Sequence, residues 1–465
     1  MTGAVSMRSS MHQKIAQPFS RHEMRSAKAS ACEVQKPFVH SALWSVIGNA
    51  SQRFGQWAIL IVLAKLGTAE LIGVYALALA ACNPLMMFSY MQLGSVLAAD
   101  STQEYPFAFY WRIRVLLCSI AAVVIVLVSL ACGMSALQML VIFALALAKV
   151  FEGLSDMRQG LLKRADRMDL LALTQVIRAL VTVVLFVLVF SMTSDLFLSV
   201  CSLVCGWAGC LVLVDLPLSR KVMSAAERMP PDLSWKKSNR KQWQPFVASV
   251  LPLGLISLVV SAYVYLPQYY LKVNFGDVSL GLFVAVASLP VVLETIARSV
   301  AQATIPRFAA FCASRDEAGF TRLYRNSLLA FLLIGTSGVL IAWLWGELIL
   351  SWLFNPEIAG YHSLLLVMAL ATATSVLCSY ASIFVSLKQY TAFLKLWCFG
   401  LASLAILGFL LVPTYGVYGA AWAIVASNVI RIALIHNSIY KLLKISFRER
   451  PRNPKYEPSR AIPAA

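Results

Sequence analysis

The sequence predicts an all-α membrane protein that crosses the bilayer many times. Of its 465 residues, 60% are apolar and only 13% are charged, and the mean hydropathy is +0.75. Soluble proteins carry about 25% charged residues, so this composition excludes a disordered chain and argues against a cytosolic enzyme. Windows of about 20 apolar residues, the length that spans a bilayer as a helix, recur along the whole chain.

Twelve such windows predict twelve transmembrane helices. They are 42–64, 72–97, 112–132, 136–157, 170–190, 195–215, 246–269, 279–304, 328–351, 361–386, 392–412 and 416–439. We expect two lobes of six helices, 38–215 and 246–440, joined by a basic cytoplasmic linker at 216–245. The polar segment 1–37 lacks the apolar core of a signal peptide, so it is expected to be a disordered tail, and 441–465 to be a second tail.

The distribution of basic residues predicts the orientation. Cytoplasmic loops carry an excess of Lys and Arg, and 32 of the 39 basic residues fall on the side of the two tails. The connections on the other side carry only Lys65 and Lys272. Both termini are therefore expected in the cytoplasm. The net charge of +18 is spread over short loops, which suits anionic lipid headgroups and not a nucleic acid.

Several kinds of catalytic or metal site are missing from the sequence. It has no GxxxxGK[ST] phosphate loop, no large outer loop and no clustered His residues. Its ten cysteines lie mostly in apolar runs without a CxxC pair, and Cys201, Cys205 and Cys210 share a helix face but lack a fourth metal ligand. We therefore expect neither an enzyme nor a metal or other cofactor, and transport becomes the favoured function.

Two segments suggest an internal duplication. Residues 64–84 read AKLGTAELIGVYALALAACNP, and residues 273–290 read VNFGDVSLGLFVAVASLP. Each contains a second glycine, Gly73 or Gly281, and reaches a proline in mid-span. Six spans in each half give a parallel repeat, an arrangement that leaves a cavity between two lobes.

Polar side chains form stripes on otherwise apolar helices. A central Arg or Lys costs about 2.5–3.5 kcal/mol on insertion scales, so these stripes should face water or protein. Residues three and four apart share a helix face, which groups Asn49, Gln52, Arg53 and Gln56 on one helix, Gln175, Arg178 and Thr182 on a second, and Glu294, Arg298 and Gln302 on a third. We expect Arg53 and Arg298 to face the cavity. A helix–helix network, or a local Glu294–Arg298 salt bridge, is the alternative.

Other intramembrane residues have more than one interpretation. Glu294 is the only clearly intramembrane acid, so it is the candidate for coupling transport to an ion, whereas Arg431, Glu152 and Asp156 are expected to snorkel to the headgroups. Aromatic residues of the seventh span form either a stacking surface for sugars or an interfacial belt; with the neighbouring amide they are Tyr263, Tyr265, Gln268, Tyr269 and Tyr270. Excess cations favour an anionic ligand, and guanidinium suits phosphate or diphosphate.

Three segments resemble the oligosaccharide flippases of the multidrug/oligosaccharidyl-lipid/polysaccharide exporter (MOP) superfamily, which include O-antigen translocases. They are SQRFGQWAILIVLAKLGTAELIGVYALALA, LLKRADRMDLLALTQVIRAL and PTYGVYGAAWAIVASNVI. The resemblance, over about 38–440, implies two six-helix lobes forming a V, with helices 1, 2, 7 and 8 lining a central cavity. It implies translocation of a polyprenyl-diphosphate-linked oligosaccharide across a bacterial inner membrane. By helix and depth, Arg53 and Arg298 match arginines implicated in diphosphate binding.

The resemblance also implies functional partners: the lipid-linked oligosaccharide itself, membrane lipids, and a polysaccharide polymerase and glycosyltransferases of the same pathway. Two other functions stay open. A cation-coupled multidrug exporter of the same superfamily usually has an intramembrane acid, often on helix 1, where this chain has Arg53. A membrane scaffold of a polysaccharide-assembly complex would not transport at all.

Overall fold

Helices make up all of the regular structure in the residues that the computed structural model describes, which confirms the all-α prediction. These residues are 38–100, 105–223, 237–314, 316–354, 358, 360–381, 383–384 and 389–448. The helices are α3 (Phe38–Leu66), α4 (Ala69–Tyr90), α5 (Leu93–Ala99), α6 (Phe107–Ala131), α7 (Ala136–Arg164), α8 (Met168–Thr193), α9 (Leu196–Cys210), α10 (Leu216–Val222), α12 (Lys237–Ser288), α13 (Val291–Ser314), α14 (Glu317–Leu353), α16 (His362–Cys378) and α18 (Tyr390–Arg448).

The two predicted tails have different outcomes. The tail predicted at 1–37 lies outside the described residues. The tail predicted from residue 441 begins as helix, because α18 continues to Arg448.

Side-chain caps fix where several helices begin. Ser135 and Gln138 form a reciprocal capping box at the start of α7, which satisfies two backbone N–H groups that have no partner within the helix. The Thr68 hydroxyl accepts from Leu71 N before α4, and the Asp195 carboxylate accepts from Phe197 N and Leu198 N before α9. The short polar connections between the apolar runs therefore set the helix boundaries.

The predicted multi-pass membrane fold is also confirmed. Among the described residues, nine helical segments are long and apolar enough to cross a membrane. Helices α3 and α13, which carry the polar stripes with Arg53 and Arg298, are not among the nine. The predicted number of twelve membrane helices stays a prediction.

Two of the nine segments are too long for one crossing, and a glycine divides each of them. Helix α12 has 52 residues and α18 has 59, whereas a bilayer needs about 20. Gly276 in α12 has φ 77° and Gly416 in α18 has φ 57°. Only glycine adopts such positive φ values without steric cost, so the chain reverses direction at these two positions.

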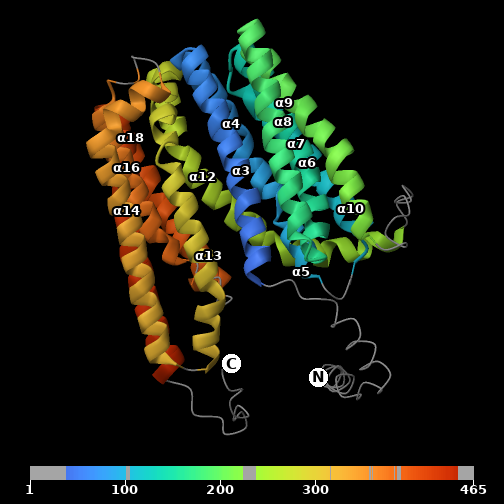
Figure 1. The fold of residues 1–465 in the computed structure, drawn as a ribbon, viewed down its shortest axis with the longest axis vertical. Coiled ribbons are helices and arrows are strands. Elements are labelled where there is room, and N and C mark those ends of the chain that lie inside the picture. Colours follow the sequence, from blue (N-terminus) through green and yellow to red (C-terminus); the bar gives the residue numbers. More distant parts are fainter. Residues whose placement is uncertain are drawn as a thin grey trace.

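The helices form two lobes. Helices α3, α4, α6, α7, α8 and α9 contact one another in the first lobe, and α13, α14, α16 and α18 do so in the second. Figure 1 shows the two groups, blue to green and yellow to red, with α12 between them. The start of α3 and the end of α18 lie at the lower end of this view, which we call the terminal end. The opposite end, where α12 turns back, is called the turn end.

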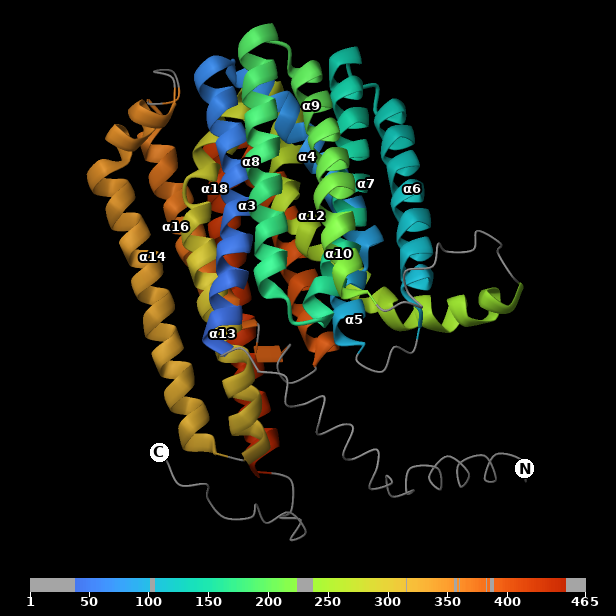
Figure 2. The same cartoon turned by 45° about the vertical axis from the view of Figure 1, so that its right-hand side comes forward.

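The boundary predicted at residue 246 lies inside α12. Figure 2 shows the first turns of this helix running across the terminal end of the first lobe. There Trp243, Phe246 and Val250 pack in an apolar cluster with Tyr110 and Met223. The start of α12 is therefore attached to the first lobe, and the rest of the helix runs along α4 into the space between the lobes.

The lobes meet at the turn end. The side chain of Asp277 accepts from Gln138 Nε2 of the first lobe at 2.8 Å and from Lys272 Nζ at 2.7 Å. Beside it, the backbone of Asp277 lies so close to Gly73 in α4 that a Cβ atom at Gly73 would clash with it. These contacts hold the turn of α12 against α4 and α7 of the first lobe.

Candidate functional site

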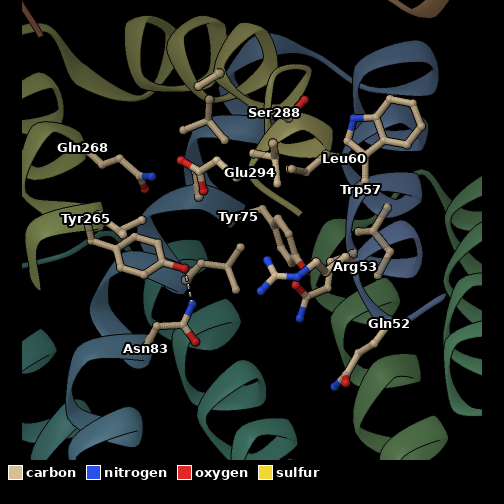
Figure 3. Close-up of a pocket in the computed structure, with 18 of the residues that line it drawn as sticks. Gln52, Arg53, Trp57, Leu60, Tyr75, Asn83, Tyr265, Gln268, Ser288 and Glu294 are labelled. Atoms are coloured by element: carbon tan, nitrogen blue, oxygen red, sulfur yellow. Dashed lines mark hydrogen bonds between the residues drawn. The ribbon is translucent and has the colours of Figure 1, made fainter. Parts of the chain in front are cut away.

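A cavity of about 410 Å³ lies between the two lobes. Its walls come from α3, α4, α7, α8 and α9 on one side and from α12, α13, α16 and α18 on the other. Figure 3 shows polar side chains pointing into it from both sides, among them Arg53 of α3 and Glu294 of α13. A central cavity is the arrangement that the internal duplication predicts.

Eight of the ten predicted site residues line this cavity. They are Gln52, Arg53, Gln56, Arg178, Tyr265, Gln268, Glu294 and Arg298. The other two, Asn49 and Gln302, do not line it and are exposed on their helices. Asn49 donates to Ser45 Oγ at 3.4 Å, one turn nearer to the terminal end. Because a polar stripe runs along several turns while the cavity meets only some of them, the end members of two stripes fall outside it.

Arg53 and Arg298 approach the cavity from opposite walls. The Arg53 guanidinium points from α3 toward the centre of the cavity (Figure 3), and it lies within electrostatic reach of Arg298 and Glu294. The Arg298 side chain is 55% exposed, so a ligand in the cavity can reach it. The two guanidinium groups can therefore approach one anion from both lobes.

The Glu294 carboxylate has two partners on its own lobe. It lies 3.9 Å from the Arg298 guanidinium, one helical turn away, and its Oε1 accepts from Ser375 Oγ of α16 at 3.0 Å. Glu294 is 30% exposed. The local Glu294–Arg298 salt bridge that the sequence left open is thus present, and it coexists with the position of both residues on the cavity wall.

The tyrosines of α12 serve different purposes. Tyr265 lines the cavity, and its hydroxyl accepts from Asn83 Nδ2 of the first lobe at 2.5 Å (Figure 3). Tyr269 and Tyr270 are not part of the lining. Their hydroxyls donate to the backbone carbonyls of Ala80 and Ala405 at 2.6 and 2.9 Å. Tyr265, with Gln268 beside it, leaves a polar and aromatic surface facing the cavity.

Arg178 belongs to a buried network as well as to the cavity wall. It is 3% exposed, donates to Ser155 Oγ at 2.5 Å and lies 4.7 Å from the ring centre of Trp207. Ser155 in turn donates to the Asp215 carboxylate. The positive charge of Arg178 is therefore balanced within the first lobe by Asp215, the last residue of the predicted span 195–215.

The prediction that Glu152 snorkels to the headgroups is wrong. Glu152 lines the cavity, and its carboxylate pairs with Lys149 Nζ at 2.6 Å, with the two side chains 13% and 8% exposed. Glu294 is therefore not the only acid in the cavity. The i,i+3 spacing of Lys149 and Glu152 was visible in the sequence. The depth of the two side chains was not, because α7 extends to Arg164, beyond the predicted end of the span at residue 157.

Asp156 does not snorkel freely either. Its carboxylate accepts from Arg114 Nη2 at 2.7 Å, and the Arg114 side chain is fully buried. Arg114 also lies 4.8 Å from the ring centre of Tyr90. Arg114 is near the start of the predicted span 112–132, and the structure buries its side chain inside the first lobe.

The prediction that Arg431 snorkels is wrong as well. Arg431 is 2% exposed and lies in the cavity wall. Its guanidinium carbon is 3.8 Å from the ring centre of Trp397 and 4.7 Å from that of Tyr263. Tyr263 comes from α12, and Trp397 comes from the part of α18 before Gly416. Helical spacing in the sequence could therefore not show that they enclose the guanidinium.

The chain matches the family described as "Polysaccharide biosynthesis protein" over residues 38–312, which is more than half of its length. A relative, the capsular polysaccharide biosynthesis protein CapF of Staphylococcus aureus, is 24% identical over 394 residues, which cover 83% of this chain and 95% of CapF.

Two solved structures share the fold. One is a multidrug-resistance MATE-family transporter of the MOP superfamily in an inward-facing conformation, with a TM-score of 0.66 and 14% identity over 88% of this chain and 100% of that one. The other is a MOP superfamily transporter from Pyrococcus furiosus, with a TM-score of 0.61 and 16% identity over 88% and 95% of the two chains. The chain therefore belongs to the polysaccharide biosynthesis protein family, and it has the fold of the MOP superfamily transporters.

Proposed function

We propose that this protein is a flippase that moves a polyprenyl-diphosphate-linked oligosaccharide from the cytoplasmic to the outer leaflet of a bacterial inner membrane. The observation that carries the proposal is the charge of the central cavity. Five of its lining side chains are cations, Arg53, Lys149, Arg178, Arg298 and Arg431, and two are carboxylates, Glu152 and Glu294. Family membership and the relationship to CapF support a polysaccharide repeat unit as the cargo.

The chemistry of a diphosphate fits this cavity. Guanidinium groups bind phosphate through two parallel N–H···O bonds, and such bonds gain strength where water is excluded. Arg53 and Arg298, from opposite walls, are the residues that we assign to the diphosphate. Tyr265, Gln268, Gln52 and Gln56 add aromatic and amide surface, which suits the ring faces and hydroxyl groups of sugars.

Transport would proceed by alternating access. Because the lobes meet at the turn end around Gly73 and Asp277, that end must separate before a ligand can leave through it. We assign the terminal end, with both termini, to the cytoplasm on the basis of the loop cations. With this orientation, the conformation described here receives the lipid-linked oligosaccharide from the cytoplasmic leaflet.

The cavity charge disfavours the main alternative. A cationic compound would be repelled by this cavity, because cations predominate among its charged lining residues. In the proposed function the chain performs no covalent chemistry. Glycosyltransferases would supply its cargo and a polysaccharide polymerase would consume it. A scaffold without transport activity is an outcome of the test below.

The test is reconstitution of the full chain in proteoliposomes with a fluorescent polyprenyl-diphosphate oligosaccharide. Wild-type protein is expected to move the probe between leaflets, and Arg53→Gln to slow this movement at least tenfold. Arg322→Gln is the matched control, because it removes an exposed cation outside the central cavity. Equal movement of the probe between leaflets with and without wild-type protein would overturn the proposed flippase function and favour a scaffold. Movement of a cationic dye instead would favour the exporter.

A further inference from the structure

A cluster of aromatic residues around one arginine lies outside the central cavity, at the terminal end of the first lobe. The guanidinium carbon of Arg158 in α7 lies 4.9 Å from the ring centre of Phe107 and 4.8 Å from that of Trp111, both in α6. Its Nη1 donates to Met223 Sδ at 3.6 Å. We call these four residues the Arg158 cluster. None of them lines the cavity between the lobes, so the cluster belongs to a different place in the fold.

The described part of the chain gives Arg158 no ion-pair partner. The Asp156 carboxylate, one helical turn earlier on the chain, is bound by Arg114. The Asp215 carboxylate lies within electrostatic reach of Arg158, but it accepts from Ser155 in the buried network of the first lobe. The positive charge of Arg158 is therefore not neutralised by a carboxylate of its own.

A second arginine adds positive charge beside the cluster. Arg220 of α10 is exposed and lies within electrostatic reach of Arg158, and Lys221, which follows it, is exposed as well. Like charges repel each other, so the packing of α7 against α10 holds these cations together. An anion between Arg158 and Arg220 would relieve their repulsion.

One edge of the Arg158 guanidinium lacks a protein acceptor. Its Nε is buried and has no hydrogen-bond partner in the described residues, and the structure gives Nη2 no acceptor among them either. These two N–H groups form an edge of the kind that binds a phosphate through two parallel hydrogen bonds. Buried donors without an acceptor are rare in folded proteins. Because the side chain as a whole is only half-buried, a ligand can approach this edge.

The depth of the cluster corresponds to the headgroups of one leaflet. Arg158 lies about 33 Å along α7 from Ala136, at 1.5 Å per residue, whereas the hydrocarbon core of a bilayer is about 30 Å thick. Trp111 lies in the second turn of α6, and Trp is enriched where a membrane meets water. The first turns of α12, which cross this end of the lobe (Figure 2), add Trp243 and Phe246 to the same apolar cluster. A phosphate at this depth belongs to a phospholipid.

We propose that the Arg158 cluster binds the phosphate of an anionic phospholipid, such as phosphatidylglycerol, in the leaflet at the terminal end. Arg158 holds the phosphate oxygens through Nε and Nη2, and Arg220 adds its charge. Phosphatidylcholine has the same phosphate but also a cationic choline, which the two arginines would repel, so it should bind more weakly. This inference does not rest on the proposed function, because the cluster lies outside the cavity assigned to the cargo.

The test is native mass spectrometry of the full chain in detergent, titrated with phosphatidylglycerol or with phosphatidylcholine of the same acyl chains. The mass of each complex counts the bound lipids and gives the Kd of the first one. We expect wild type to bind phosphatidylglycerol about tenfold more tightly than phosphatidylcholine. Arg158→Gln should raise the Kd for phosphatidylglycerol by about tenfold or more, because it removes a charge-assisted contact. Arg158→Lys should restore part of the affinity, since it keeps the charge but not the two-pronged geometry.

The controls separate this site from other ways of binding an anion. Arg322→Gln removes an exposed cation from α14 in the other lobe, and it should leave both Kd values unchanged. Inorganic phosphate should not displace the lipid, because it lacks acyl chains; displacement at equal concentrations would show that the site takes free phosphate. Equal Kd values of wild type for the two lipids, or an unchanged Kd for phosphatidylglycerol in Arg158→Gln, would overturn the proposal.

A second variant covers the case in which Arg158→Gln does not fold. Arg220→Glu changes an exposed side chain, so the packing around Arg158 is retained while a carboxylate replaces the neighbouring cation. It should abolish the preference for phosphatidylglycerol, and Arg322→Glu, with the same change of charge, should keep it. If folded Arg220→Glu keeps the preference of wild type, Arg158 is a packing residue and the proposed lipid site is wrong.

Discussion

Gly73 and Gly281 lie against each other where α4 crosses the second part of α12, although they belong to different halves of the chain. A Cβ atom at Gly281 would lie 2.9 Å from Gly73 N and would clash with the carbonyl oxygen of Ala69. These are the glycines that the internal duplication placed in corresponding positions. Their missing side chains allow the two lobes to approach at the turn end.

A bulky residue at this crossing should keep the turn end open. Gly281→Leu is expected to shift the protein away from the closed turn end, because its side chain meets backbone atoms that cannot move aside. Distances between spin labels on the two lobes at that end should lengthen. Gly209→Ala is the control, since a Cβ atom there meets nothing within 4 Å. Unchanged distances in Gly281→Leu would show that the crossing does not set the conformation.

The proposed topology can be tested with reporter fusions. Fusions after Lys241 and after Lys455 should report the cytoplasm, and a fusion after Gly276 should report the outer side. The reason is the concentration of Lys and Arg on one side of the membrane. A cytoplasmic signal at Gly276 would contradict the two-lobe orientation proposed here.

Arg53 and Arg298 should each contribute to diphosphate affinity. Replacing either with Ala removes a charge-assisted contact worth about 1.5–3 kcal/mol, which corresponds to roughly a 10- to 150-fold increase in Kd. Lys should restore only part of this affinity, because it lacks the bidentate geometry. The measurement is the Kd of the purified protein for a water-soluble polyprenyl diphosphate with a short prenyl chain. Ala variants with unchanged affinity and normal membrane levels would leave both arginines as packing residues.

Glu294 is the candidate for coupling transport to protons. The variant Glu294→Gln keeps the contact with Ser375 but cannot gain or lose a proton. If a proton on Glu294 drives a step of the cycle, the pH dependence of probe movement in proteoliposomes should flatten in this variant. Glu152→Gln is the comparison, as it removes the other cavity carboxylate. A pH profile identical to that of wild type would make the Glu294–Arg298 pair structural.

The Arg114–Asp156 pair should stabilise the first lobe. Asp156→Asn leaves the fully buried Arg114 without its counter-charge. Breaking a fully buried ion pair lowers the free energy of unfolding by about 3 kcal/mol. The decrease should be smaller here, since Asp156 is 35% exposed. The thermal unfolding midpoint in detergent should fall by several degrees, without a change in ligand affinity at lower temperature. Asp316→Asn, at the exposed start of α14, is the control. A midpoint equal to that of wild type would show that the pair does not contribute.

Much of this protein follows from its sequence, because a bilayer imposes strong local rules. Backbone groups in lipid must be satisfied within a helix, so the apolar runs predict the all-α fold. Polar stripes cannot face lipid, so spacing alone predicted that Arg53, Arg298 and Glu294 face water or protein. The internal duplication then favoured a cavity for the two arginines. The turns at Gly276 and Gly416 also separate predicted spans, as their local conformation requires.

The tertiary structure decided which charges are neutralised and by what. The sequence treated Arg431 and Glu152 as residues near the headgroups, because helical spacing gives the face of a residue but not its depth or its neighbours on other helices. Arg431 lies between Trp397 and Tyr263, which are distant in the sequence, and Arg178 reaches Asp215 through Ser155. Electrostatic energies depend on distances between side chains of different helices. Only the packed structure could therefore show which cavity cations have a carboxylate partner and which do not.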